Sequence, residues 1–185
     1  MKNYLIQYKP FLLFLAKFLI SYLVLTFIYK SYLNQFNQGL PVVDGFTQLV
    51  AQQSRQVLQF FDRDTVVLLE NDPSFVKFFY NEIYIVRIVE GCNALSIIIL
   101  FAAFIVAFTG KLKHTVLYII GGSLLIHILN ITRIAFLIML IYNFPKWQSF
   151  WHDIVFPLII YGFVFLLWII WISKFSLNTK THAST

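Results

Sequence analysis

Three side chains that together can carry out acyl transfer stand far apart in this sequence. Cys92, the single cysteine of the 185 residues, lies in Glu90-Gly91-Cys92-Asn93-Ala94. A cysteine attacks as its thiolate, and because a free cysteine has a pKa of about 8.5, it needs a neighbouring cation or base at neutral pH. Arg133 offers a cation that cannot act as a base, and His152 offers a group that exchanges protons near neutral pH. These residue types predict a cysteine-based site wherever the fold brings them together.

The elements that must position these residues are membrane-spanning helices. Hydrophobic residues make up 59% of the chain and charged residues 12%, whereas a soluble domain carries about 25% charged residues. Apolar runs long enough to cross a hydrocarbon core of about 30 Å occupy residues 11–29, 92–109, 115–142 and 154–173. We therefore predict an all-α polytopic membrane protein with about four transmembrane helices.

The charge distribution predicts the orientation of these helices. The net charge of +6 fits the positive-inside bias of membrane proteins, so no nucleic-acid partner is expected. With the N-terminus inside, every acidic residue falls outside, and the lysines that flank the spans fall inside: Lys2, Lys9, Lys111, Lys113, Lys174 and Lys180. The predicted organisation is an N-terminal transmembrane anchor at 1–29, an extracytoplasmic loop or cap at 30–90, a three-span membrane core at 91–173 and a disordered cytoplasmic tail at 174–185.

The segment between the first two spans predicts a small extracytoplasmic cap. Residues 45–61 alternate apolar side chains with glutamines in a pattern typical of a helix that lies along a surface. Residues 65–69 and 83–89 are short and rich in β-branched side chains, and Asn71-Asp72-Pro73-Ser74 is typical of a turn. The cap can therefore contain short strands.

A depth count places the three chemical residues at one face of the membrane. A helix rises about 1.5 Å per residue, so a span that starts at Thr115 reaches Arg133 after about 27 Å, close to the outer limit of the core. Cys92 and His152 each begin a span that enters from that same side. The residues beyond Arg133, at 134–142, either continue the span as a tilted helix or bend back as a re-entrant cap.

Three sequence blocks resemble the signature motifs of the exosortases and archaeosortases, and most closely those of the short F-type exosortase branch. The blocks are Glu90-Gly91-Cys92-Asn93-Ala94-Leu95-Ser96, Asn130-Ile131-Thr132-Arg133 and Trp151-His152-Asp153, and the resemblance covers residues 85–162. It implies a membrane-embedded cysteine protease or transpeptidase with Cys92 as nucleophile, Arg133 as essential cation and His152 as acid and base. The chain departs from the family in having fewer spans than the larger members, and Asn93-Ala94 replaces a small Ser-Gly type pair.

The resemblance also implies substrates and a location. The expected substrates are exported proteins that end in a short recognition motif, a transmembrane helix and a basic tail. The acyl group would pass through a thioester to an unknown envelope acceptor or to water. The expected location is the bacterial inner membrane, with the active site facing the periplasm. Because the sequence has neither metal-spaced Cys and His pairs nor a glycine-rich phosphate loop, neither a metal nor a cofactor is expected.

Several neighbouring polar residues are supporting candidates. Asn130 lies one helical turn before Arg133, and it either hydrogen-bonds the guanidinium or a substrate carbonyl or packs between helices. Asn93 follows the thiol directly. Glu90 binds substrate or pairs with Arg87. Asp153 can orient His152, although adjacent residues of an α-helix point about 100° apart.

Each assignment also has a purely structural alternative. Cys92 can be a small buried hydrophobe, Arg133 a headgroup anchor and His152 part of an interfacial aromatic belt. His127 fits a buried histidine that a neighbour satisfies better than it fits a second base. Together these alternatives describe a non-catalytic membrane assembly or transport subunit, in which Arg133, Asn130 and His127 form an interhelical polar network.

Overall fold

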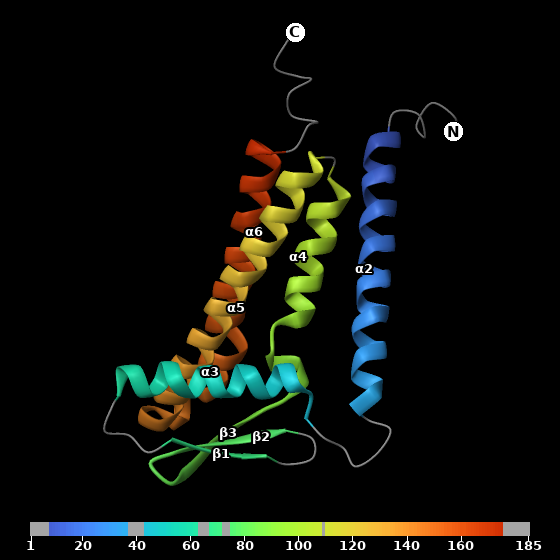
Figure 1. Ribbon diagram of the computed structural model, residues 1–185. Coiled ribbons are helices and arrows are strands. Elements are labelled where there is room, and N and C mark those ends of the chain that lie inside the picture. The colour runs from blue at the N-terminus through green and yellow to red at the C-terminus, as the bar shows by residue number, and fades with distance from the viewer. Residues whose placement is uncertain (1–7, 37–42, 63–66, 72–74, 109, 176–185) are drawn as a thin grey trace.

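The computed structural model describes residues 8–36, 43–62, 67–71, 75–108 and 110–175. Figure 1 shows apolar helices running side by side, with the first and last described helices starting and ending at one end of the bundle and a crossing helix and small sheet at the other. This architecture confirms the predicted all-α polytopic membrane protein with a small cap. The predicted tail from residue 176 onward lies outside the described residues.

Within the described part of the chain, the stretches long and apolar enough to cross a membrane are Lys9–Asn34, Leu112–Asn143 and Phe150–Lys174. They correspond to helix α2 (Lys9–Phe36), helix α5 (Leu112–Asn143) and helix α6 (Phe156–Lys174) with the turn before it. The predicted spans at 11–29, 115–142 and 154–173 all fall within these stretches.

The predicted span at 92–109 is shorter in the structure than the sequence indicates. Helix α4 covers Leu95–Ala107, 13 residues, which corresponds to about 20 Å. It begins late because Ala94 adopts a left-handed backbone conformation, with φ of 63°, and a helix cannot continue through such a residue. The thiol therefore precedes the helix instead of opening it.

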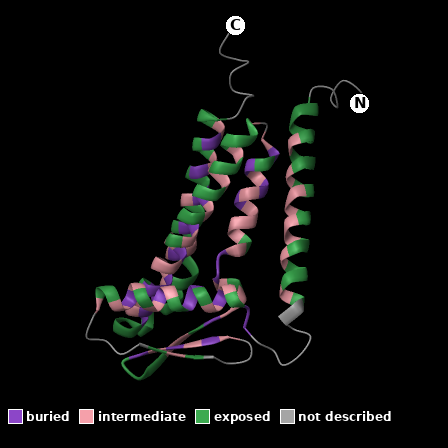
Figure 2. Ribbon diagram, viewed as in Figure 1, coloured by how far each residue is buried: buried purple, intermediate pink, exposed green. Residues whose placement is uncertain are grey.

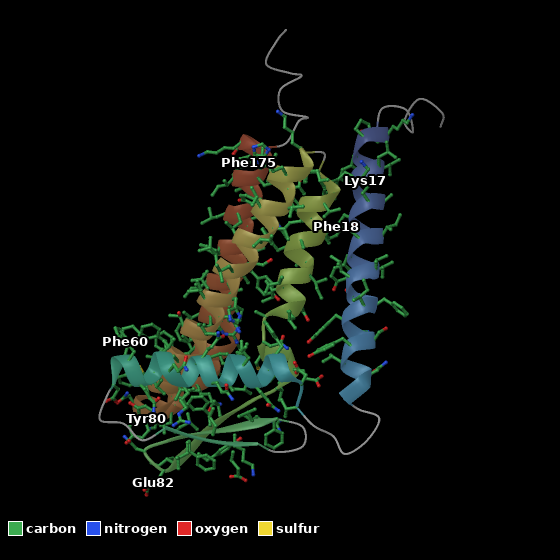
Figure 3. The ribbon with its side chains drawn as sticks, viewed as in Figure 1. Lys17, Phe18, Phe60, Tyr80, Glu82 and Phe175 are labelled. Carbon is green, nitrogen blue, oxygen red and sulfur yellow. The ribbon has the colours of Figure 1, made fainter. Side chains whose placement is uncertain are left out.

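Helix α2 packs along α4 through aromatic rings. Phe14 and Phe18 of α2 contact Phe104, and Phe14 also contacts Phe108; Figure 3 shows Phe18 projecting toward α4. Much of the remaining surface of α2 is exposed and apolar (Figure 2), which is the composition expected of a lipid-facing helix.

Helices α4, α5 and α6 enclose the core of the bundle. Phe101, Ile126 and Trp171 are buried there. The Tyr118 hydroxyl donates a hydrogen bond to the Leu167 carbonyl, with an oxygen–oxygen distance of 2.7 Å. This bond gives a partly buried phenol a partner and ties α5 to α6.

Helix α3 (Gly45–Phe61) crosses the end of the bundle, with the same bounds that the sequence predicts. Asp44 caps it, because its Oδ1 accepts hydrogen bonds from the backbone N–H groups of Phe46 and Thr47, both at 3.0 Å. Figure 1 shows α3 lying between the bundle and the sheet. Its buried face includes Val50 and Leu58, so the predicted surface helix also braces the cap.

The cap contains an antiparallel sheet of strands β1 (Val67–Asn71), β2 (Val76–Tyr80) and β3 (Ile83–Ile88), in the order β1-β2-β3. The described parts of the predicted segments 65–69 and 83–89 lie mainly in β1 and β3. Strand β2 was not predicted. Its buried residues alternate with less buried ones, but the apolar Phe79 lies on the less buried face, so the sequence does not show the alternation of apolar and polar side chains that is typical of a strand. The predicted turn at 71–74 falls largely outside the described residues.

Helix α5 continues beyond Arg133 without a break, so residues 134–142 do not re-enter the membrane. Ile134, Ala135 and Ile138 are buried against side chains of α3 and the sheet in one hydrophobic core. The far third of α5 thus carries the cap, and the pocket described next lies at this junction.

Candidate active site

Cys92, Arg133 and His152 line one pocket of about 460 Å³. Arg133 comes from α5, His152 from the turn that precedes α6, and Cys92 from a 3₁₀ turn, η1 (Glu90–Cys92), which follows β3. Besides these three, the lining residues are Tyr84, Ile85, Val86, Arg87, Ile88, Val89, Ile134, Leu137, Ile141 and Gln148. The sequence placed the three residues at one membrane face, and the fold brings them to one cavity.

The backbone of Cys92 is held on two sides. Its N–H donates to the carbonyl oxygen of Val89 at 2.8 Å, and its carbonyl oxygen accepts a hydrogen bond from Asn130 Nδ2 at 2.8 Å. The thiol is free and partly exposed. The expectation that Cys92 sits at the N-terminus of a span is wrong, because the left-handed Ala94 separates it from α4.

Asn93 has a structural role behind the thiol. It is buried, and its Nδ2 donates to Thr47 Oγ1 at 3.1 Å and to the Tyr29 hydroxyl at 3.3 Å. Its Oδ1 accepts from the N–H of Leu95 at 3.0 Å. Asn93 therefore ties α2, α3 and the start of α4 together, and it does not line the pocket.

Arg133 is partly buried, and its Nε has no hydrogen-bond partner among the described residues. Cys92 and Tyr161 lie close enough to interact electrostatically with the guanidinium. Asn130 donates a hydrogen bond to the Cys92 carbonyl. This partner was not predicted, because the expected roles of Asn130 were a bond to the guanidinium, a bond to a substrate carbonyl or packing between helices. A buried, unpaired N–H beside a thiol is a donor available to a ligand.

His152 lies in a π-helical turn, Phe150–Val155, and its Nδ1 is 2.6 Å from Asp153 Oδ1. In such a turn the hydrogen bonds run from i to i+5, so adjacent side chains point closer together than in an α-helix. Because an ionised carboxylate only accepts, Nδ1 carries the proton and the neutral ring keeps Nε2 as its base. The separation of about 100° between adjacent residues applies to an α-helix, so in this π-helical turn it does not argue against Asp153 as the residue that orients His152.

Glu90 lies just outside this pocket and does not pair with Arg87. Burial and the negative charge of Asp44 raise the pKa of the Glu90 carboxyl. Arg87 instead places its guanidinium over the ring of Phe75, 5.6 Å from the centroid, and it lines the pocket.

Two polar lining residues were missed from the sequence. Gln148 precedes His152 by about one helical turn, and Arg87 is the cation of the strand that leads to the thiol. Their closeness in sequence to His152 and to Cys92 was the signal that could have identified them as lining residues. His127 is bound to α3 through one ring nitrogen, because its Nε2 lies 2.7 Å from Gln53 Oε1, while its buried Nδ1 has no hydrogen-bond partner among the described residues.

Comparison with known proteins identifies the family. No curated protein and no solved structure matches the chain. The family model for the transmembrane exosortases matches residues 7–172, which include the whole bundle up to the last turns of α6 as well as the cap and the pocket. The match does not assign a branch within the family. Because it spans about nine-tenths of the sequence, this chain belongs to the transmembrane exosortase family.

Proposed function

We propose that this protein is a cysteine protease or transpeptidase that trims the C-termini of exported proteins. The observation that carries the proposal is that Cys92, Arg133 and His152, contributed by three separate elements, line one pocket. A nucleophile, a fixed cation and a group for proton transfer are the parts that acyl transfer through a thioester requires.

In the proposed first step, Nε2 of His152 takes the proton of the Cys92 thiol, and the resulting thiolate attacks the carbonyl carbon of the scissile peptide bond. The oxygen of that carbonyl becomes an oxyanion, and the guanidinium of Arg133 stabilises it; a donor of this kind is typically worth about 3 kcal/mol. His152 then gives a proton to the leaving amine as the carbon–nitrogen bond breaks. The products are a thioester on Cys92 and a free C-terminal fragment.

In the proposed second step, an amine of an envelope acceptor or a water molecule attacks the thioester. His152 takes the proton of the attacking group, and Cys92 leaves as the thiolate. The cycle restores both residues and requires neither metal nor cofactor.

The proposed location follows from the substrate. A site at one end of the bundle, beneath the cap, lies where the backbone of a substrate leaves the bilayer next to its own transmembrane helix. We place the protein in the bacterial inner membrane with its N-terminus and C-terminus inside and the pocket facing the periplasm. The substrates would be exported proteins with a C-terminal motif, a helix and a basic tail.

The non-catalytic alternative has two observations in its favour. His127 bonds Gln53, and Asn130 bonds the backbone of Cys92, so both residues hold the fold together. Arg133, the third member of the alternative network, instead lines the pocket, and its Nε, like His127 Nδ1 and Asn130 Oδ1, has no hydrogen-bond partner in the described chain. The enzyme proposal accounts for that unpaired donor.

The deciding experiment compares exported proteins from cells that carry the native chain, Cys92→Ala or Leu68→Ala. Leu68 is exposed on β1 and serves as a control away from the pocket. We expect the Cys92→Ala cells to accumulate proteins with untrimmed C-termini, as measured by mass spectrometry, and the Leu68→Ala cells to match the native pattern. Native trimming in Cys92→Ala cells, with the variant present at normal abundance, would leave the non-catalytic alternative standing.

A further inference from the structure

The wall of the pocket that leads to Cys92 is made by an unbroken stretch of chain. Every residue from Tyr84 to Val89 lines the cavity. Successive side chains of a strand point to opposite faces of a sheet, so a cavity lying against one face would be lined by alternate residues. Because every residue of this stretch lines the cavity, we infer that the cavity is a groove that runs along the edge of β3.

That edge has no strand partner among the described residues. β3 pairs with β2 on one side only, and the sheet order ends with it. The two-residue turn Asn81-Glu82, with φ of 49° and 64°, closes this hairpin. In an antiparallel ladder, alternate residues direct their N–H and C=O groups away from the partner strand. β3 therefore offers a row of unpaired backbone groups along the groove.

The opposite wall has the chemistry to hold an extended peptide. Ile134, Leu137 and Ile141 of α5 are apolar and follow one another along the groove, and Arg133 and Gln148 add hydrogen-bond donors. None of the described residues that line the cavity is acidic. Backbone carbonyls of a peptide would therefore meet donors and apolar surface, without like-charge repulsion from a carboxylate.

We propose that the substrate binds by β-strand addition, with the segment next to its scissile bond pairing along the free edge of β3. This inference rests on the proposed function, because the groove ends at Cys92. Six residues of strand extend about 20 Å, so the paired segment is about six residues long. Main-chain hydrogen bonds would supply affinity, and pockets for alternate side chains would supply selectivity.

The test uses disulfide trapping. The chain has one cysteine, so Tyr84→Cys in a Cys92→Ala background leaves a single thiol on the groove-lining strand. The probe is an exported protein whose trimming is lost in Cys92→Ala cells, with single cysteines placed at each successive residue before its cleavage site. Leu68→Cys in the same background is the matched control, because Leu68 is exposed on β1 and lies outside the groove.

Strand addition predicts that Tyr84→Cys forms a disulfide with one probe position and more weakly with the positions two residues before and after it, but not with the positions directly adjacent to it, because successive side chains of a strand point to opposite faces. Leu68→Cys should form none above the level seen with unrelated membrane proteins. A spacing of three or four positions would indicate a helical ligand and overturn the proposal, as would uniform trapping. Trapping between two copies of this chain in the absence of probe would assign the edge to self-association. If trimming requires Cys92 but no alternate pattern appears, strand addition is wrong and the proposed function stands. If trimming does not require Cys92, the proposed function itself fails.

Discussion

The backbone around Cys92 is fixed more firmly than its side chain. Val89 and Asn130 hold the N–H and carbonyl of the residue, while the sulfur remains free in a partly exposed position. A nucleophile presented this way keeps its place while its side chain can rotate toward a substrate. Asn130 is thus a positioning residue for the proposed chemistry.

The contact between His152 and Asp153 leads to a graded prediction. His152→Ala should slow cleavage by about 10² to 10⁴, the usual contribution of general acid and base catalysis. Asp153→Asn should cause a smaller loss, because the amide oxygen still accepts from Nδ1 but no longer favours the imidazolium. Rates of C-terminal cleavage, measured against pH in detergent with an exported protein whose trimming requires Cys92, test both variants. Equal losses in the two would contradict an orienting role for Asp153.

The left-handed conformation of Ala94 leads to a second prediction at this scale. Glycine avoids a steric penalty of about 1 to 2 kcal/mol in this region, while losing the buried methyl costs about 0.8 kcal/mol. Ala94→Gly should therefore leave the free energy of unfolding and the activity nearly unchanged. Ala94→Val should lower both the free energy of unfolding and the activity, because a β-branched side chain fits the left-handed conformation poorly. Thermal unfolding and cleavage measure the two effects.

Glu90 leads to a pH-dependent prediction. Its pKa is raised in the folded protein by burial and by Asp44, so the stability it contributes is complete below the unfolded pKa of about 4.3 and is lost as the pH rises through the folded pKa. Glu90→Gln should therefore raise the unfolding temperature near neutral pH and have little effect near the unfolded pKa. Tryptophan fluorescence during heating at several pH values tests the sign. Stabilisation confined to acidic pH would contradict the assigned cause.

At the scale of elements, α3 acts as a brace between membrane core and cap. His127 of α5 bonds Gln53 of α3, Asn93 bonds Thr47, and the Tyr80 hydroxyl of β2 donates to Asp62 at the end of α3. These bonds join α3 to the bundle, the thiol segment and the sheet. The helix that the sequence places on a surface thereby holds the sheet and the thiol segment against α5.

The packing of α4 against α5 depends on one of two adjacent glycines. A Cβ at Gly122 would overlap the buried ring of Phe101, while a Cβ at Gly121 would meet nothing within 4 Å. Gly122→Ala should destabilise the protein by about 1 to 3 kcal/mol through overpacking. Gly121→Ala should be neutral or stabilising by up to about 1 kcal/mol, because alanine favours the helix. Unfolding in mixed detergent measures both, and similar effects at the two positions would contradict the packing.

At the scale of the whole molecule, the cap and the pocket lie at one end of the bundle. Helix α5 spans 32 residues, about 48 Å, which is longer than a hydrocarbon core of about 30 Å. Its first residues lie at the same end of the bundle as the start of α2 and the end of α6, and its last residues support the cap (Figure 1).

This geometry predicts the outcome of cysteine-accessibility labelling in a Cys92→Ala background. Probes at Leu68→Cys and Lys146→Cys should react with an impermeant reagent added outside the cell, because the cap faces outward in the proposed orientation. A probe at Lys113→Cys should react only after permeabilisation, because the lysines at that end fall inside. The reverse pattern would place the pocket in the cytoplasm and contradict the proposed periplasmic chemistry.

The sequence by itself determined the membrane class, helix α3 and the distance along its helix at which Arg133 lies. These properties depend on composition, on a pattern within one segment or on a constant rise per residue. In a membrane, helix hydrogen bonds stay within a segment, so such counting transfers well. The tertiary structure decided that β2 joins the sheet, that Ala94 breaks the helix after Cys92, that a π turn brings Asp153 to His152 and that Asn130 holds the Cys92 carbonyl. Each of these outcomes depends on local backbone irregularity or on partners distant in sequence, and spacing along the chain specifies neither.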